Sequence, residues 1–124
     1  MATILCVEDE PALREDLLDE LRDAGFEAVG AANGAEGLAE IERRRPDLVI
    51  CDVTMPVMNG IEMLRALREG EPRLARTPVL FLSALEDVAR LLPAGLKAEG
   101  FLTKPVDYEV IVASARMFVG ASAA

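Results

Sequence analysis

Short runs of consecutive apolar residues alternate along the chain with longer segments in which apolar residues recur at every third or fourth position. A run that is apolar throughout is typical of a strand that helices cover on both faces. We therefore expect strands over residues 3–8, 26–30, 48–51, 79–82 and 101–103, with the strand over 26–30 near an edge. Five strand–helix units in series predict an α/β fold, a doubly wound parallel sheet with helices on both faces.

The segments between these runs carry helix signals. Pro11 suits the first turn of a helix, Gly25 suits its end, and Asn33 is a candidate N-cap for a second helix. The expected helices cover residues 11–24, 34–45, 61–68, 85–92 and 111–118. Their inward-facing residues are expected to be Leu13, Leu17, Leu21, Leu38, Ile41, Ile61, Leu64, Leu67, Ile111, Ala115 and Phe118.

Turn and helix-breaking residues modify the later elements. Asn59-Gly60 is interpreted as a turn before the helix over 61–68. Pro93 and Gly95 are expected to shorten or kink the helix over 85–92 near its end. The small residues of the tail, 120–124, are expected to fray.

Length, charge and the lack of histidine limit the classes of protein to which this chain can belong. With 124 residues, the chain is expected to be one domain over 1–124 with no output domain. A net charge of −9 argues against direct binding of nucleic acid, because phosphate contacts need Lys and Arg. The chain has no histidine, which excludes Ser-His catalysis, His-ligated zinc and a role as a phosphohistidine donor.

The cysteines and the N-terminus indicate a location. Cys6 and Cys51 lie inside apolar runs, and we expect reduced, buried thiols of a cytoplasmic protein. A signal peptide is not expected, because the acidic stretch 8–10 interrupts the first apolar run. No apolar stretch is long enough to cross a membrane, so no membrane partner is expected.

Polar side chains follow four of the five predicted strands. Glu8-Asp9 follows the first, Asp52 the third, Ser83 the fourth and Lys104 the fifth. Because the carboxyl ends of parallel strands share one edge of a sheet, these groups are expected to converge on one pocket.

Several sequence fragments surround these polar residues: Glu8-Asp9, Asp52 with Met55-Pro56 and Asn59-Gly60, Ser83-Ala84, and Phe101-Leu102-Thr103-Lys104-Pro105. Taken in order, they resemble a response regulator receiver domain (CheY-like), the phosphoacceptor module of two-component signal transduction, over essentially the whole chain. The resemblance implies a flavodoxin-like sheet with the strand order 2-1-3-4-5.

The resemblance also implies a role for each residue of the pocket. Asp52 is the phosphoacceptor, which attacks the phosphorus of a phosphohistidine donor. Lys104 and the Ser83 hydroxyl contact the phosphoryl oxygens. Ser83 and Phe101 form a switch, and Pro105 follows the lysine through a cis peptide bond. An ordinary core residue is the alternative interpretation of Phe101.

A metal and protein partners are implied as well. Strand order 2-1-3 places Asp9 and Asp52 side by side, and clustered carboxylates raise each other's pKa unless a cation lies between them. Mg²⁺ (or Mn²⁺) suits such a site. The implied ligands are Asp9, Asp52 and the backbone carbonyl of Thr54, with Glu8 acting directly or through water. The implied partners are a sensor histidine kinase or histidine phosphotransfer protein and an unknown downstream protein.

The leading hypothesis is therefore a phosphoacceptor signalling domain that is not an enzyme and signals through the face formed by the fourth helix, fifth strand and fifth helix. Two alternatives stay open. One is a receiver-like scaffold that works without phosphorylation. The other is an aspartate-nucleophile phosphatase of the haloacid dehalogenase type, which usually has a second aspartate where this chain has Thr54.

Two positions depart from the family pattern. Lys97 stands where the family usually has glycine, and Pro93 falls in the last turn of the fourth predicted helix. Neither position touches the pocket, but both change the expected shape of the signalling face.

Overall fold

The computed structural model describes residues 2–84, 87, 90, 92–93 and 95–123. The strands are β1 (Thr3–Val7), β2 (Glu27–Ala31), β3 (Leu48–Cys51), β4 (Val79–Ser83) and β5 (Gly100–Thr103). The helices are α1 (Pro11–Asp23), α2 (Gly34–Arg44), α3 (Gly60–Glu69) and α5 (Tyr108–Ala123). These bounds agree with the sequence-based expectations to within a few residues.

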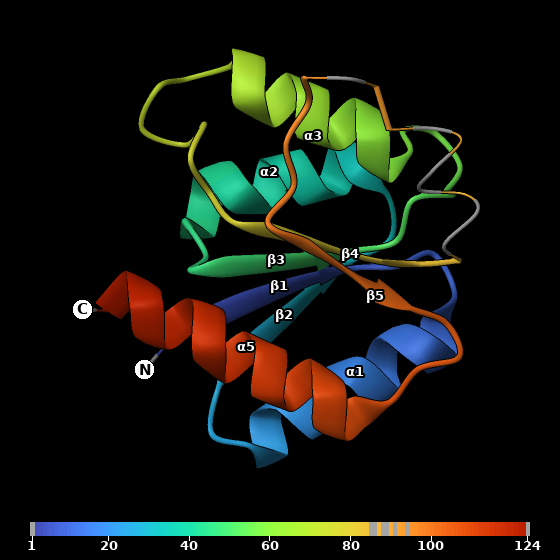
Figure 1. Cartoon of the computed structure of the whole chain (residues 1–124), viewed down its shortest axis with the longest axis vertical. Coiled ribbons are helices and arrows are strands. Elements are labelled where there is room, and N and C mark those ends of the chain that lie inside the picture. Colours follow the sequence, from blue (N-terminus) through green and yellow to red (C-terminus); the bar gives the residue numbers. More distant parts are fainter. Residues whose placement is uncertain (1, 85–86, 88–89, 91, 94, 124) are drawn as a thin grey trace.

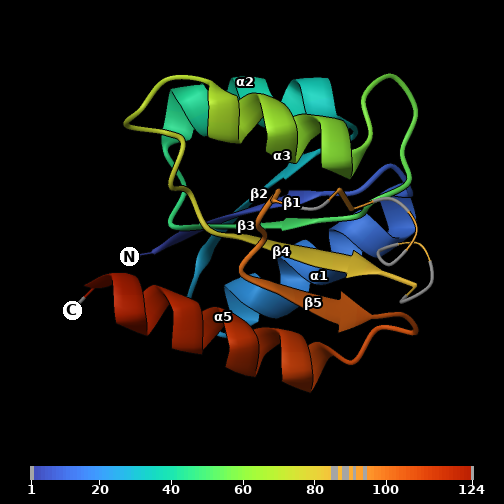
Figure 2. The ribbon, with the colours of Figure 1, turned by 45° about the horizontal axis from the view of Figure 1, so that its top comes forward.

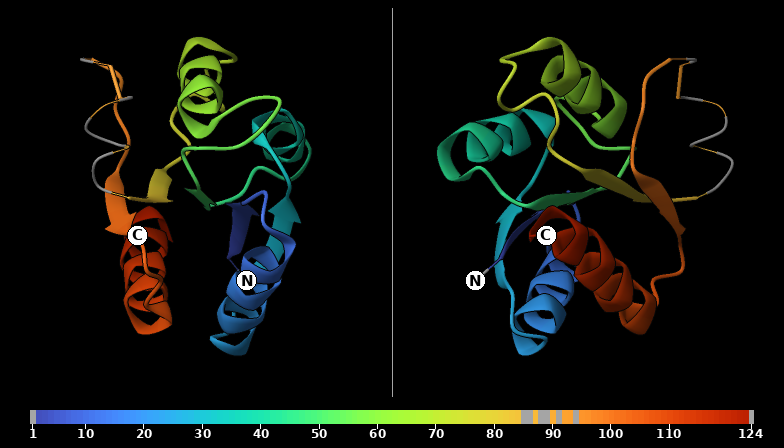
Figure 3. Two further views of the ribbon diagram at one scale, coloured as in Figure 1. Left: turned by 90° about the vertical axis from the view of Figure 1, so that its right-hand side faces the viewer. Right: turned by 60° about the vertical axis from the view of Figure 1, so that its left-hand side comes forward.

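The five strands form one parallel sheet in the order β2-β1-β3-β4-β5, as the resemblance implied (Figures 1 and 2). The expectation that β2 lies at an edge is confirmed. All strands point in the same direction, so their carboxyl ends meet at one edge of the sheet. The left panel of Figure 3 faces this edge.

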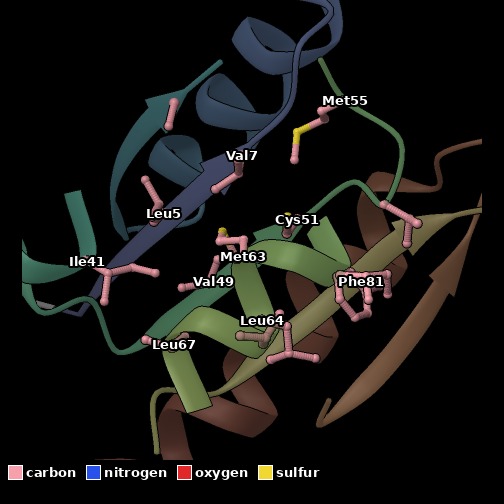
Figure 4. Packing of buried hydrophobic residues seen from close by; sticks show 14 residues of the cluster. Leu5, Val7, Ile41, Val49, Cys51, Met55, Met63, Leu64, Leu67 and Phe81 are labelled. Atoms are coloured by element: carbon pink, nitrogen blue, oxygen red, sulfur yellow. The ribbon is translucent and has the colours of Figure 1, made fainter. Parts of the chain in front are cut away.

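Helices cover both faces of the sheet. Figures 1 and 3 show α2 and α3 on one face and α1 and α5 on the other. Alternate residues of β1 divide between the two layers: Leu5 and Val7 pack with the α2/α3 side, and Ile4 and Cys6 pack with the α1/α5 side. Figure 4 shows the α2/α3 side, where Met63 and Leu64 of α3 pack over the strands. Burial on both faces explains why the three central strands, β1, β3 and β4, are almost entirely apolar, whereas the edge strands β2 and β5 are partly exposed.

The two cysteines are buried in this core and are not joined in a disulfide. Burial raises the pKa of the Cys6 thiol to about 12 and that of Cys51 well above its ordinary value. Both thiols therefore act as small apolar core groups, as expected. Within the described part of the chain, no helix has the length and apolarity needed to cross a membrane.

Asn59-Gly60 does not form a separate turn, and that interpretation was wrong. Asn59 is the N-cap of α3, and Gly60 is its first residue. The Asn59 side chain accepts a hydrogen bond from the Glu62 amide, and the Glu62 carboxylate accepts one from the Asn59 amide. This reciprocal pair satisfies two amides that the first turn of a helix leaves open. Asn33 caps α2, as predicted.

The fourth predicted helix, 85–92, falls mostly on residues outside the described part of the chain. Leu92 and Pro93 are described, and neither is helical, which agrees with the expectation that Pro93 ends the helix. Residues 95–99 run alongside α3 (Figure 1), where the Arg68 side chain donates to the carbonyl of Lys97. Leu92 and Leu96 pack against the α2/α3 side of the core.

Arg68 of α3 makes four hydrogen bonds, two of them to the residues before β5 and two to the connection between α3 and β4. Its guanidinium donates to the carbonyls of Ala75 and Thr77 at 2.9 and 2.7 Å and to the carbonyl of Lys97 at 3.2 Å. It also pairs with the Glu99 carboxylate at 2.8 Å. One arginine thus joins α3, the connection to β4 and the residues before β5.

At the C-terminus, α5 continues through Ala123, five residues beyond the expected end at 118. Alanine has the highest helix propensity of all residues, and three of the last four residues of the chain are alanine. The expected inner stripe is confirmed: Ile111 and Ala115 are buried, and Phe118 packs against the same layer of the core.

Candidate acidic site at the carboxyl edge of the sheet

Three carboxylates gather where β1 and β3 end. Glu8 and Asp9 follow β1, Asp52 follows β3, and these two strands are paired neighbours. One carboxylate oxygen from each of the three side chains can lie within 4.8 Å of the others. Strand pairing thus brings together acidic residues that are more than 40 positions apart in sequence.

Glu8 and Asp52 are buried, with 2% and 8% of their surface exposed, whereas Asp9 is exposed. Backbone hydrogen bonds fix the two buried residues. The Glu8 amide donates to the carbonyl of Ala31 at 3.0 Å, and the Asp52 amide donates to that of Val7 at 3.0 Å. The Val53 amide donates to Asp52 Oδ1 at 2.7 Å, which fixes the plane of this carboxylate.

Lys104 brings the one ammonium group that contacts this cluster among the described residues. Its Nζ lies 3.2 Å from Asp52 Oδ2 and 3.3 Å from Glu8 Oε1. Its backbone amide donates to the carbonyl of Ser83 at 3.2 Å, so the ends of β4 and β5 are joined at the site. The peptide bond from Lys104 to Pro105 is cis, as expected.

Ser83 and Phe101 occupy different environments. Ser83 is buried at the end of β4. Phe101 is 41% exposed, which excludes the interpretation of this side chain as an ordinary core residue. Its ring stacks on Phe81, with centroids 6.0 Å apart.

Sequence reasoning missed how closely α3 approaches the site. A Cβ at Gly60 would collide with the backbone carbonyl of Asp52 and would also press on Phe81 and Cys51. Glycine therefore lets the amino end of α3 pack directly against the acidic strand end. The signal was present in the sequence, since Asn59 with Glu62 three positions later is a capping pattern. Thr54, named as a candidate ligand through its carbonyl, lies exposed two residues after Asp52.

The crowding of charge changes two ionisation equilibria. Burial raises the pKa of the Glu8 carboxyl to about 7, and Asp9 and Asp52 shift it in the same direction. The Glu10 amide and Lys104 act against this shift. Burial also works against the charge of Lys104, but the carboxylates of Asp52 and Glu8 outweigh it and raise the pKa of Lys104.

The donor set fits a hard divalent cation. Three carboxylates face one ammonium group, and carboxylate oxygens are the ligands that Mg²⁺ prefers in proteins. A cation that keeps several waters can sit at the exposed Asp9 side of the cluster while it reaches the buried pair.

The raised pKa of Glu8 leads to a test of stability. The folded state holds a proton on Glu8 up to about pH 7, whereas the ordinary value is 4.5. Stability without metal should therefore fall as pH rises between these values and level off above them. Glu8→Gln removes this loss and should stabilise the protein by about 1–3 kcal/mol near pH 8, and by less than about 1 kcal/mol near pH 5.

Urea unfolding followed by circular dichroism measures both values, with Glu10→Gln, an exposed change in the same loop, as the control. A gain for Glu8→Gln that is equal at the two pH values would contradict the proposed cost of ionising Glu8.

Comparison with known proteins places this geometry in a family. The chain is 40% identical over 112 residues to the probable transcriptional regulatory protein TcrX of Mycobacterium tuberculosis, a match that covers 89% of this chain and 46% of that protein. The chain thus spans about half the length of the curated relatives it matches.

Several of those relatives are transcriptional regulators by name, and one is a DNA-binding response regulator. The expectation that no nucleic acid is among the partners is therefore not supported. The charge of −9 bears only on this chain, and the relatives extend well beyond the part that it matches.

Solved structures agree on the fold. The chemotaxis response regulator CheY4 of Vibrio cholerae superposes with a TM-score of 0.85 at 34% identity, covering 95% of this chain and 98% of that one. The receiver domain of the sensor histidine kinase PA1611 of Pseudomonas aeruginosa superposes with a TM-score of 0.87 at 25% identity, covering 96% and 98%. That structure has a magnesium ion coordinated in its active site cleft.

The family of response regulator receiver domains matches residues 4–116, which include every strand but the first residue of β1 and all the candidate site residues. This chain therefore belongs to the response regulator receiver domain family of two-component signal transduction.

Proposed function

We propose that this receiver domain accepts a phosphoryl group on Asp52 from a phosphohistidine of a sensor histidine kinase or a histidine phosphotransfer protein. The observation that carries the proposal is the contact of Lys104 Nζ with Asp52 and Glu8 within a group of three carboxylates. The same arrangement argues against a scaffold that works without phosphorylation, which has no need to hold these charges together. The family match also leaves the phosphatase alternative without support.

The transfer uses the Asp52 carboxylate as the nucleophile. One of its oxygens forms a bond to phosphorus while the bond from phosphorus to the histidine nitrogen breaks, and the leaving imidazole takes up a proton. The hydrogen bond from the Val53 amide holds the carboxylate in one orientation, which favours in-line attack. The protein itself contributes mainly positioning and charge stabilisation to such a transfer.

A divalent cation, Mg²⁺ or Mn²⁺, would be held by Asp9, Asp52 and the backbone carbonyl of Thr54, with Glu8 acting directly or through water. When bound, it offsets the negative charge of the carboxylates and of the incoming phosphoryl oxygens. The magnesium ion in the active site cleft of the PA1611 receiver domain supports a divalent cation at this site.

Lys104 and Ser83 stabilise the product. Lys104 Nζ lies 3.2 Å from Asp52 Oδ2, close enough to donate a hydrogen bond to a phosphoryl oxygen once Asp52 is phosphorylated. Ser83 ends the neighbouring strand, and its hydroxyl supplies a hydrogen bond to another phosphoryl oxygen. The reduced, buried thiols of Cys6 and Cys51 suit action in the cytoplasm.

The signal leaves the site through the aromatic pair. Phe81 lies between the site and Phe101, because it pairs with Cys51, the residue before Asp52, on one neighbouring strand and with Phe101 on the other, and its ring stacks on that of Phe101. A phosphoryl group that draws Ser83 inward makes room for a new position of Phe101. The bonds of Ser83 and Lys104 to the phosphoryl oxygens exist only in the phosphorylated state, so they favour one arrangement of β5 and α5. These two elements present the surface to the downstream partner.

Asp52→Asn should abolish phosphorylation. Intact-mass measurement after incubation with acetyl phosphate and Mg²⁺ should show one added phosphoryl group on the unaltered chain and none on the variant, because an amide oxygen is a poor nucleophile. The control is Asp47→Asn, a change at the opposite edge of the sheet, which should label normally. Undiminished labelling of Asp52→Asn would disprove the assignment.

Asp9→Asn should weaken Mg²⁺ binding by about tenfold or more in the absence of any phosphodonor, because it removes a charged ligand from the site. Affinity in the unaltered chain should also fall as the pH drops, since protons compete with the metal for carboxylates. Isothermal titration calorimetry measures both effects, with Glu10→Gln as the matched control. Equal affinity in Asp9→Asn and the control would remove Asp9 from the ligand set.

Ser83→Ala should uncouple the site from the output face. Beryllofluoride, a mimic of the phosphoryl group, should shift amide resonances around Asp52 in both the unaltered chain and the variant. Shifts over residues 100–118 should appear only in the unaltered chain, because the variant lacks the hydroxyl that the mimic attracts. Identical shifts over 100–118 in both proteins would show that the response takes another route.

A further inference from the structure

Arg14 on α1 contacts the acidic loop from outside the group of site residues named so far. Its Nη1 donates a 2.7 Å hydrogen bond to the backbone carbonyl of Glu8. That carbonyl belongs to the planar peptide unit that joins Glu8 to Asp9. A hydrogen bond to its oxygen therefore fixes the orientation of the plane from which both acidic side chains leave the backbone.

The hydrogen bond from Arg14 adds to other contacts that hold Glu8 in place. Its amide is held by the carbonyl of Ala31, and its carboxylate contacts Lys104 and the amide of Glu10. Asp9 is different, because it is exposed and gains little restraint from packing. Its position depends on the backbone of the preceding peptide unit, and Arg14 holds that unit at its oxygen.

Two residues involved in this contact are unfavourable for the helix or strand in which they lie. Arg14 is the fourth residue of α1, near the positive end of the helix dipole, where a cation is unfavourable. Gly30 lies inside β2, where glycine weakens a strand. A Cβ at Gly30 would lie 3.1 Å from Arg14 Cδ and 3.2 Å from Leu18 Cδ1, so glycine leaves room for the arginine side chain.

We propose that Arg14 is a positioning residue of the metal and phosphoacceptor site, which orients the Glu8–Asp9 peptide so that Asp9 meets the cation together with Asp52. This inference rests on the proposed function, because it requires the cation site described above. Arg14 touches neither the reacting atoms nor the cation and acts through the backbone.

The chain offers a matched control at the other end of the same helix. Arg22 Nη2 donates to the carbonyl of Ala28 at 2.8 Å. Like Arg14, it links α1 to a backbone carbonyl, but this carbonyl belongs to β2 and lies far from the acidic loop. Arg14→Met and Arg22→Met each remove one such bond. A role limited to attaching α1 to the sheet predicts the same outcome for both variants.

The sign of the change in metal affinity separates the possible roles. Removing a cation near three carboxylates should by charge alone strengthen the binding of Mg²⁺. Loss of positioning should instead weaken it, by about tenfold, as for outer partners that orient metal ligands. Arg14→Met should therefore bind Mg²⁺ more weakly than the unaltered chain, and Arg22→Met should stay within about twofold of it.

The experiment is a calorimetric titration of the full chain and the two variants with Mg²⁺, together with urea unfolding without metal and hydrogen exchange at the Glu10 amide. The proposal expects similar losses of stability in both variants, but weaker Mg²⁺ binding and faster Glu10 exchange only in Arg14→Met. Arg14→Lys, which keeps a cation and a donor of different reach, should give an intermediate affinity. It serves as the test if Arg14→Met does not fold.

Two results would overturn the inference: tighter Mg²⁺ binding by Arg14→Met, or affinity and exchange in this variant equal to those of Arg22→Met. Failure of the unaltered chain to bind Mg²⁺ would count against the proposed function instead. The exchange rate of the Glu10 amide would still report in that case whether Arg14 holds the loop.

Discussion

Glu8 and Asp52, two buried carboxylates at the ends of neighbouring strands, repel each other, and the ammonium group of Lys104 only partly offsets this repulsion. Burial is the main cause of the raised pKa of Glu8, and the neighbouring carboxyl groups of Asp9 and Asp52 shift it in the same direction. Such a site gains stability from added positive charge and loses it when the negative charges stand alone. The remainder of the fold keeps these groups together against their repulsion.

The sheet supplies that restraint through backbone pairing. The register between β1 and β3 sets Val7 opposite Cys51, so the acidic residues that come next are delivered to the same level. The three central strands, β1, β3 and β4, are buried under helices on both faces, which holds the ends of β1 and β3 together. Gly60 lets α3 pack directly against the carbonyl of Asp52 and closes the site from one side.

Much of this arrangement could be predicted from the sequence because it depends on local patterns that repeat. Continuous apolar runs predict covered parallel strands, and parallel strands predict that the residues after them share one edge. The strand order came from the resemblance to a family, since periodicity alone does not rank neighbouring strands. The misinterpreted Asn59 shows the limit of local signals: Asn-Gly is typical of turns, and only Glu62 three residues later distinguishes a helix cap.

Contacts between side chains and backbone groups of other elements could not be predicted from the sequence. Arg14 and Arg68 have the pattern of polar helix residues in the sequence, yet each donates to carbonyls that the tertiary fold brings near. The exposure of Phe101 was open for a similar reason, because it depends on which other elements cover β5 and not on the apolar character of β5 itself.

The bonds made by Arg68 have a mechanical consequence for β5. The residues just before this strand are anchored to α3 through Lys97 and Glu99, and the Glu99 amide also donates to the carbonyl of Val79. The opposite end of the strand is joined to β4 by the pairing that ends at Ser83 and by the Lys104 amide. β5 is therefore fixed to α3 and β4 at its amino end, whereas its carboxyl end is tied to the strand end that carries Ser83. The proposed phosphorylation of Asp52 would act on this carboxyl end, and through it on α5, which follows it in the chain.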